Sequence, residues 1–196
     1  MPVGSAKYDT ATYVSAYGLD TLTTTMLWDD VSLTVAEKDV INALQIVAPN
    51  VSNVNLIGAK NGGNGRVPIV KMQDSSTPIP LRSMGEGMNR MLGIALALVN
   101  AKDGMLLIDE VDTGLHYSVL PDLWKLIFEV AHRLNVQVFA TSHSWDCIQA
   151  FQLAAEENNE EEGIVIRLET QDGEVVPVTF DKRKLSIATR EQIEVR

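Results

Sequence analysis

The sequence predicts an α/β layer architecture in which two central strands are parallel. The first observation is a pair of short apolar runs, residues 105–109 (MLLID) and 136–141 (VQVFAT), of the length expected for buried strands. The second is the segment between them, residues 118–134, whose apolar residues recur at helical spacing. A strand, a helix and a strand in this order form a parallel crossover unit, so we expect both strands in one sheet.

Local patterns predict the other elements. A continuously apolar helix at 87–101 is expected to lie at the centre of the domain, and residues 1–30 show only weak periodicity. The order is hairpin, helix, strand, helix, strand, helix, hairpin, which places β-hairpins at both ends. The remaining predicted elements are a helix over 34–47, a hairpin of residues 54–60 and 66–72 around the turn NGGNG, a helix over 145–157, and a hairpin over 164–180 with an Asp172-Gly173 turn.

Composition and charge narrow the class of protein. A chain of 196 residues that is 45% hydrophobic fits one soluble globular domain. The net charge of −10 argues against a surface that wraps nucleic acid by itself. No run approaches the ~20 apolar residues that span a bilayer, and the first residues lack the features of a signal peptide. A single cysteine, Cys147, fits a reducing compartment, so we expect a cytoplasmic protein without membrane contact.

Two neighbouring acids, Asp109 and Glu110, follow the first central strand, and Ser142-His143-Ser144 follows the second. Ligands of parallel α/β sheets lie beyond the carboxyl ends of the strands. Two carboxylates are tolerable there if a cation and a polarised water share the site. A second interpretation is open, in which both acids only cap the helix or loop that follows.

The segment Ser83-Met84-Gly85-Glu86 precedes the apolar helix at 87–101. The unpaired amides and the dipole of a helix N-terminus favour a phosphate, and a glycine lets the phosphate approach closely. The same letters also fit an ordinary capping box, with Ser83 as N-cap and Glu86 three residues later.

In this order and spacing, RSMGEG, MLLIDE, VDTGLH and ATSHS resemble the signature loop, Walker B strand, D-loop and histidine switch of an ABC-type ATPase domain. The DE…GLH form is most similar to the RecF/SMC-like branch, particularly the AAA-type ATPases related to the OLD (overcoming lysogenisation defect) proteins. That group commonly continues Glu-Asn-Gly-Leu-His-Pro, where Asp112, Thr113 and Tyr117 stand here for Glu, Asn and Pro. Arg82 and Met84 stand where many ABC proteins have Leu and Gly.

The resemblance implies a partial P-loop NTPase lobe that uses ATP and Mg²⁺. It implies that Asp109 helps to hold Mg²⁺, that Glu110 is the general base and that His143 contacts the γ-phosphate. It further implies that Ser83, Met84, Gly85 and Glu86 meet an ATP held by an opposing subunit. Any role with nucleic acid would be an analogy with the family.

The P-loop itself is not found in this sequence, which contains no Gly-Lys pair. We therefore expect residues 1–50 to be the remnant of a helical insertion and 51–196 to be the C-terminal lobe of the ATPase domain. The expected partner is a missing Walker A half or a second ATPase subunit in a homo- or heterodimer, and the isolated chain is expected to be inactive. The alternative is a non-catalytic module, derived from an ATPase, that docks on a partner and regulates it.

Overall fold

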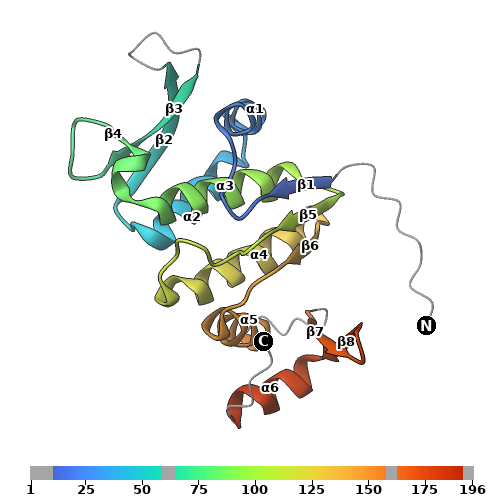
Figure 1. Ribbon diagram of the computed structural model, residues 1–196. Helices are drawn as coiled ribbons and strands as arrows, with labels where there is room; N and C mark the ends of the chain where they lie inside the picture. The colour runs from blue at the N-terminus through green and yellow to red at the C-terminus, as the bar shows by residue number, and fades with distance from the viewer. Residues whose placement is uncertain (1–10, 59–64, 158–162, 192–196) are drawn as a thin grey trace.

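A computed structural model describes residues 11–58, 65–157 and 163–191 (Figure 1). In these residues, 3-10 turns at Leu81–Met84 and Tyr117–Val119 precede the third and fourth α-helices. The elements are β1 (Ala11–Val14), α1 (Thr21–Val31), α2 (Glu37–Val47), β2 (Val51–Gly58), β3 (Arg66–Met72), β4 (Ile79–Pro80), α3 (Glu86–Asn100), β5 (Met105–Ile108), α4 (Leu120–Leu134), β6 (Gln137–Ala140), α5 (Trp145–Glu157), β7 (Val165–Gln171), β8 (Glu174–Phe180) and α6 (Lys182–Arg190).

The central sheet has the strand order β1-β5-β6, and all three strands are parallel. The prediction of two parallel central strands is therefore confirmed for β5 and β6. β1 was not predicted, because four residues in a weakly periodic segment carry too little pattern to reveal a strand. Its strand conformation comes from pairing with β5, in which Val14 lies opposite Ile108.

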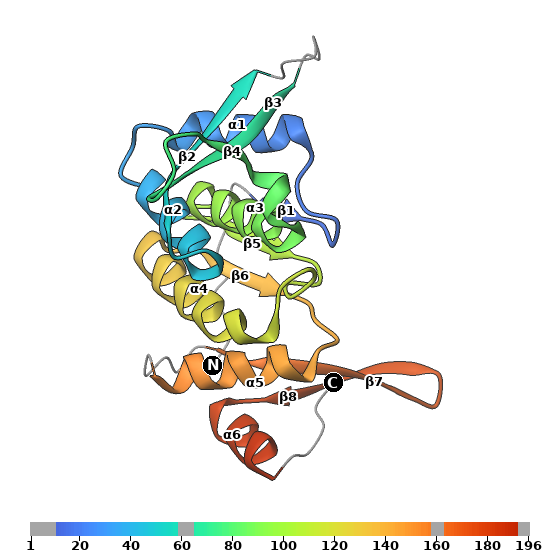
Figure 2. The same ribbon diagram turned by 90° about the vertical axis from the view of Figure 1, so that its left-hand side faces the viewer.

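Helices α3 and α4 lie on the same face of this sheet (Figures 1 and 2). The chain crosses from β1 to β5 and from β5 to β6 in the same direction, and parallel crossovers are almost always right-handed, so both connections fall on one side. α3 is buried almost all round, from Met91 to Val99, as predicted for a central helix. Leu106 and Ile108 of β5 point into the core on this side.

The other face of the central sheet is much less covered. Side chains alternate across a strand, so the residues between the buried ones point to this second face. Tyr13 is 56% exposed and Phe139 is 49% exposed there, with the half-buried Leu107 between them in register. We call Tyr13, Met105, Leu107 and Phe139 the open sheet face. Parallel sheets are ordinarily covered on both faces, so this surface is unusual.

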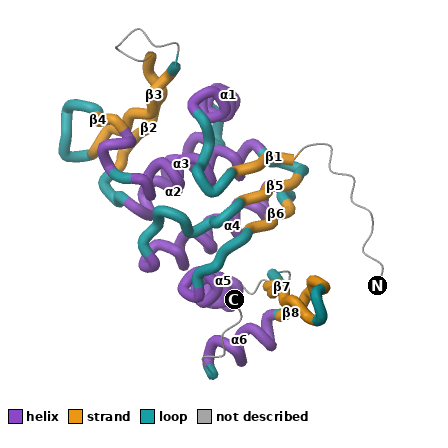
Figure 3. The backbone as a smooth tube through the Cα atoms, viewed as in Figure 1, coloured by secondary structure: helices purple, strands orange, loops and turns teal. Residues whose placement is uncertain are grey.

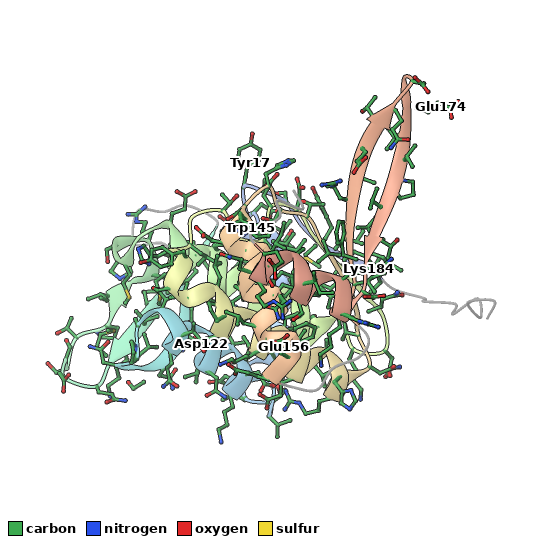
Figure 4. The ribbon with its side chains drawn as sticks, turned by 90° about the horizontal axis from the view of Figure 1, so that it is seen from below. Tyr17, Asp122, Trp145, Glu156, Glu174 and Lys184 are labelled. Carbon is green, nitrogen blue, oxygen red and sulfur yellow. The ribbon has the colours of Figure 1, made fainter. Side chains whose placement is uncertain are left out.

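Two smaller sheets flank the central one, and both predicted hairpins are confirmed as antiparallel pairs (Figure 3). β2, β3 and β4 form one sheet, whose NGGNG turn lies largely outside the described residues. β7 and β8 form the other, which projects from the body with Glu174 near its tip (Figure 4). Its turn residues Asp172 and Gly173 have φ of 51° and 86°, the left-handed pair that tightens a hairpin. Helix α6, beyond this hairpin, was not predicted.

Residues before position 50 share the main core. Trp28 of α1 and Val40 and Leu44 of α2 are buried in the same cluster as Met91 and Ile94 of α3. The division of the chain at residue 50 into an insertion remnant and a lobe stays a prediction. Within the described ranges, no helix combines the length and the apolar character needed to cross a bilayer.

Candidate functional site

The carboxyl ends of β5 and β6 bring the predicted acids and histidine together. Backbone pairing continues one step past the strands, since the amide of Asp109 donates to Val14 and the amide of Thr141 donates to Ile108, both at 2.9 Å. Asp109-Glu110 and Ser142-His143-Ser144 therefore leave the sheet side by side. The expectation that they share one edge of the sheet is met.

Thr141 joins the two acids. Its hydroxyl donates to Oδ1 of Asp109 at 2.7 Å and accepts from the amide of Glu110 at 2.9 Å. One side chain thus orients the first carboxylate and fixes the backbone of the second acid. Thr141 was not predicted as a site residue, because its only signal in the sequence is its place between β6 and the Ser-His-Ser segment.

Glu110 has a φ of 50°, a left-handed backbone conformation that is uncommon for a residue with a side chain. Its Oε1 lies 3.1 Å from Nε2 of His143. The Glu110 side chain is 29% exposed and that of His143 is 92% exposed, so both are open to a ligand.

The capping interpretation of the acids is wrong. The side-chain contacts of Asp109 and Glu110 go to Thr141 and His143, not to the segment that follows them. The 3-10 turn at 117–119 is capped by His116, whose Nδ1 accepts from the amide of Ser118. The acids are therefore oriented across the sheet edge rather than along the chain.

A second link joins the segments that follow β5 and β6. Ser142 donates from its hydroxyl to Oδ1 of Asp112 at 2.6 Å, and the amide of Val111 donates to the carbonyl of Thr141 at 3.0 Å. The hydrogen bond between Asp112 and Ser142 was not predicted, because the residues around each of them carry no information about a partner 30 positions away. Together these bonds hold the two turns as one rigid edge.

The loop before α3 does not form the capping box. Gly85, with a φ of 102°, is the N-cap of α3 and has no side-chain capping bond, while Ser83 donates to the carbonyl of Pro80 at 2.6 Å. A φ of 102° is accessible to glycine and strained for other residues. Ser83, Gly85 and Glu86 are exposed and Met84 is half-buried, so the loop presents a helix N-terminus to solvent.

The start of α3 packs directly on the turn that follows the acids. A Cβ placed on Gly87 would lie 2.8 Å from the carbonyl oxygen of Gly114, closer than real contacts allow. Gly114 has a φ of 76°, and the side chain of Glu86 lies over it. The two glycines let the helix and the turn touch backbone to backbone.

Arg90 of α3 was also missed, because it lies in a helix whose pattern is otherwise apolar. It is 3% exposed and donates to the carbonyls of Ser15 and Asp109 at 2.5 Å and of Glu110 at 2.8 Å. Burial lowers the pKa of Arg90, and the negative charges of Asp109, Asp112 and Glu110 oppose that shift.

Asp109 fits the role of a magnesium ligand. In the part of the chain that the structure describes, no three His, Cys, Asp or Glu side chains gather closely enough to hold a metal. Mg²⁺ is, however, commonly held by one or two carboxylates together with water and the phosphates of a substrate. Asp109 offers such a carboxylate, already oriented by Thr141.

Two protein relatives match parts of the sequence. An "ATP/GTP phosphatase" of Helicobacter pylori is 30% identical over 115 residues, 57% of this chain and 31% of that protein. An uncharacterized protein of Methanocaldococcus jannaschii is 40% identical over 85 residues, 43% of this chain and 71% of that protein. The chain therefore spans about a third of the Helicobacter relative.

Solved structures of SMC heads share the fold. An SMC head bound to the C-winged helix domain of ScpA has a TM-score of 0.58 at 14% identity, covering 88% of this chain and 54% of that one. A structure described under "ATP-driven dimerization and DNA stimulated activation of SMC ATPases" has a TM-score of 0.57 at 14% identity. The match covers 88% of this chain and 99% of that one. The Smc head of Pyrococcus yayanosii has a TM-score of 0.54 at 17% identity, and the match covers 81% of this chain and 29% of that one.

These structures establish the P-loop NTPase fold type, a parallel sheet flanked by helices. The family described as "AAA ATPase domain" matches residues 22–148, which run from α1 to the start of α5 and include Asp109, Glu110 and residues 141–144, but not β1. With that match covering well over half of its length, the chain belongs to the AAA ATPase domain family.

Proposed function

We propose that this chain contributes the signature loop, the Walker B acids and the switch histidine to an ABC-type ATP-hydrolysing site. The observation that carries the proposal is the convergence of Asp109, Glu110 and His143 at one sheet edge, with the Glu110 carboxylate 3.1 Å from the His143 imidazole. The similarity to an "ATP/GTP phosphatase" of Helicobacter pylori supports the same chemistry.

Each residue has a defined task in this proposal. Asp109 holds Mg²⁺, which neutralises charge on the phosphates when bound. Glu110 accepts a proton from the attacking water, a role suited to a partly exposed carboxylate. His143 donates a hydrogen bond to the γ-phosphate, and its exposure leaves that imidazole accessible. Thr141 orients the Asp109 carboxylate and holds the backbone of Glu110.

The site is completed by a Walker A half. The sequence has no Gly-Lys pair to cradle the β- and γ-phosphates. The open sheet face is apolar, with Tyr13 and Phe139 about half exposed. In parallel sheets such a face is ordinarily covered by another layer of the protein. We propose that a polypeptide segment carrying the Walker A motif packs on this face.

The signature loop then works across a dimer. Ser83, Met84, Gly85 and Glu86 lie at the N-terminus of α3, where amides and dipole favour an anion. In this arrangement they meet the γ-phosphate of an ATP held by an opposing subunit, in a homo- or heterodimer. Similarity to SMC heads supports a dimeric ATPase.

The second candidate is a non-catalytic module that docks on a partner through the open sheet face and regulates it. The absence of a Gly-Lys pair from the sequence favours this alternative. Both candidates use the same surface, and they differ in whether the acids act in hydrolysis.

Reconstitution separates them. The chain is co-expressed with a separate polypeptide that carries a Walker A motif, and phosphate release is measured with Mg-ATP. Glu110→Gln should slow turnover by about 10²–10⁴-fold while ATP binding changes much less. Glu129→Gln, at an exposed position on α4, is the matched control and should keep the full rate. A complex that hydrolyses ATP equally well with Glu110→Gln would leave the regulatory module as the better proposal.

A further inference from the structure

Arg90 holds an unusual position for a charged residue. Of the residues that the structure describes, it is the only charged one whose side chain is buried, at 3% exposure. Burying a guanidinium is costly unless its donors are used. The contacts that Arg90 makes therefore indicate what it is for.

Those contacts all go to backbone carbonyls at the candidate site. One guanidinium nitrogen donates to Ser15, in the tight turn that follows β1, at 2.5 Å. The other donates to Asp109 at 2.5 Å and to Glu110 at 2.8 Å. The turn after β1 and the acid pair after β5 are thus joined by one side chain from a third element, α3.

The backbone at Glu110 needs such support. Its φ of 50° is disfavoured for a residue with a Cβ, and such conformations persist only where the surroundings hold them. The Thr141 hydroxyl holds the amide of Glu110, and Arg90 holds its carbonyl, so both sides of the residue are fixed. With the backbone in this conformation the carboxylate reaches His143.

Arg90 also connects the acids to the loop before α3. It lies one turn beyond Gly87, whose backbone already touches Gly114 in the turn after the acids. Arg90 thus ties the carbonyls of Asp109 and Glu110 to α3, the helix that begins directly after this loop.

We infer that Arg90 is a positioning residue: it fixes Glu110 in its left-handed conformation and ties the general base to the helix that carries the signature loop. The catalytic part of this inference rests on the proposed function. The structural part does not, and the two are measured separately.

The first measurement uses the isolated chain. Amide hydrogen exchange is followed by mass spectrometry in Arg90→Met, Arg90→Lys and a control, Asn100→Leu. Asn100 lies on the same helix and donates to the carbonyls of Leu27 and Leu96, away from the acids. We expect exchange over residues 109–116 to rise about tenfold in Arg90→Met and to stay unchanged in Asn100→Leu. Arg90→Lys should fall between wild type and Arg90→Met, since one ammonium cannot span three carbonyls.

Unchanged exchange over 109–116 in Arg90→Met would overturn the inference, as would wild-type behaviour of Arg90→Lys. If Arg90→Met does not fold, Arg90→Lys carries the test alone, and its exchange over 109–116 must exceed that of wild type.

The second measurement uses the reconstituted complex. Arg90→Lys should lower kcat by about 10²-fold and leave KM for ATP nearly unchanged, because a misplaced base affects the transition state more than binding. An equal loss in Asn100→Leu would show general destabilisation and contradict a positioning role. If the wild-type complex lacks ATPase activity, the proposed function fails, and the exchange data still decide whether Arg90 holds the acid turn.

Discussion

The imidazole of His143 and the carboxylate of Glu110 lie 3.1 Å apart, on turns that follow different strands. The His143 side chain is 92% exposed and that of Glu110 is 29% exposed, so solvent reaches the contact and it contributes little to folding. His143→Ala should therefore change the free energy of unfolding by less than about 1 kcal/mol in denaturant titrations. A larger loss would mark the pair as a structural ion pair.

The isolated chain should hydrolyse Mg-ATP at background rates, because it lacks the lysine and amides that hold the β- and γ-phosphates. Phosphate release at millimolar Mg-ATP, measured with malachite green, checks this. Robust turnover that Glu110→Gln abolishes would show that the Walker A half is dispensable, and our account of the site would be wrong.

Thr141→Val should loosen the acid pair. Valine keeps the shape of threonine and removes the hydroxyl that bridges Asp109 and the amide of Glu110. We expect a loss of about 1–2 kcal/mol in unfolding free energy, near the lower end of the range for hydrogen bonds to charged groups because both bonds are exposed. Thr141→Ser retains the hydroxyl and serves as the control. The bridge is unimportant if valine and serine variants unfold at the same denaturant concentration.

Gly87→Ala should destabilise the protein because its Cβ would meet the Gly114 carbonyl at 2.8 Å, and neither backbone segment can move without disturbing the acids. The expected cost is about 1–3 kcal/mol. Gly58→Ala is the matched control, since a Cβ there meets nothing within 4 Å. Thermal unfolding of both variants measures the difference. Equal stability would mean that α3 and the turn are not held in close contact.

The buried thiol of Cys147 should lower the free energy of unfolding of the protein at alkaline pH. Burial raises the pKa of its thiol from 9.0 to about 11. Between those values the unfolded chain releases a proton that the folded chain retains, so the stabilisation is complete below pH 9 and is lost as pH rises toward 11. The loss is at most about 3 kcal/mol for this one group.

The comparison with Cys147→Ala isolates the effect, because all other titrating groups are shared. Unfolding free energies of both proteins at pH 8, 9, 10 and 11 should diverge, with the wild type losing more. Parallel curves would show that the thiol is as easily ionised in the folded state as in the unfolded state.

The sequence predicted the elements that carry strong local patterns. The apolar runs of β5 and β6, the helical spacing of α4 and the buried stripe of α3 each show within a single segment what the element is. β1 and α6 lacked such a signal: β1 is four residues long, and its strand form depends on β5. The periodicity of apolar residues shows which face of a segment is buried. A segment of only four residues is too short for such a period to be recognised.

The candidate site divides in the same way. The positions of Asp109-Glu110 and Ser142-His143-Ser144 at the ends of two parallel strands could be predicted from the sequence, and strand direction then places them at one edge. Three features became visible only in the folded chain: Thr141 bridges the acids, Glu110 adopts a left-handed backbone, and Arg90 of α3 holds it there. These are contacts between segments far apart in the chain, and each depends on the others being in place. A pattern read along one segment cannot contain the identity of a partner that only folding brings near.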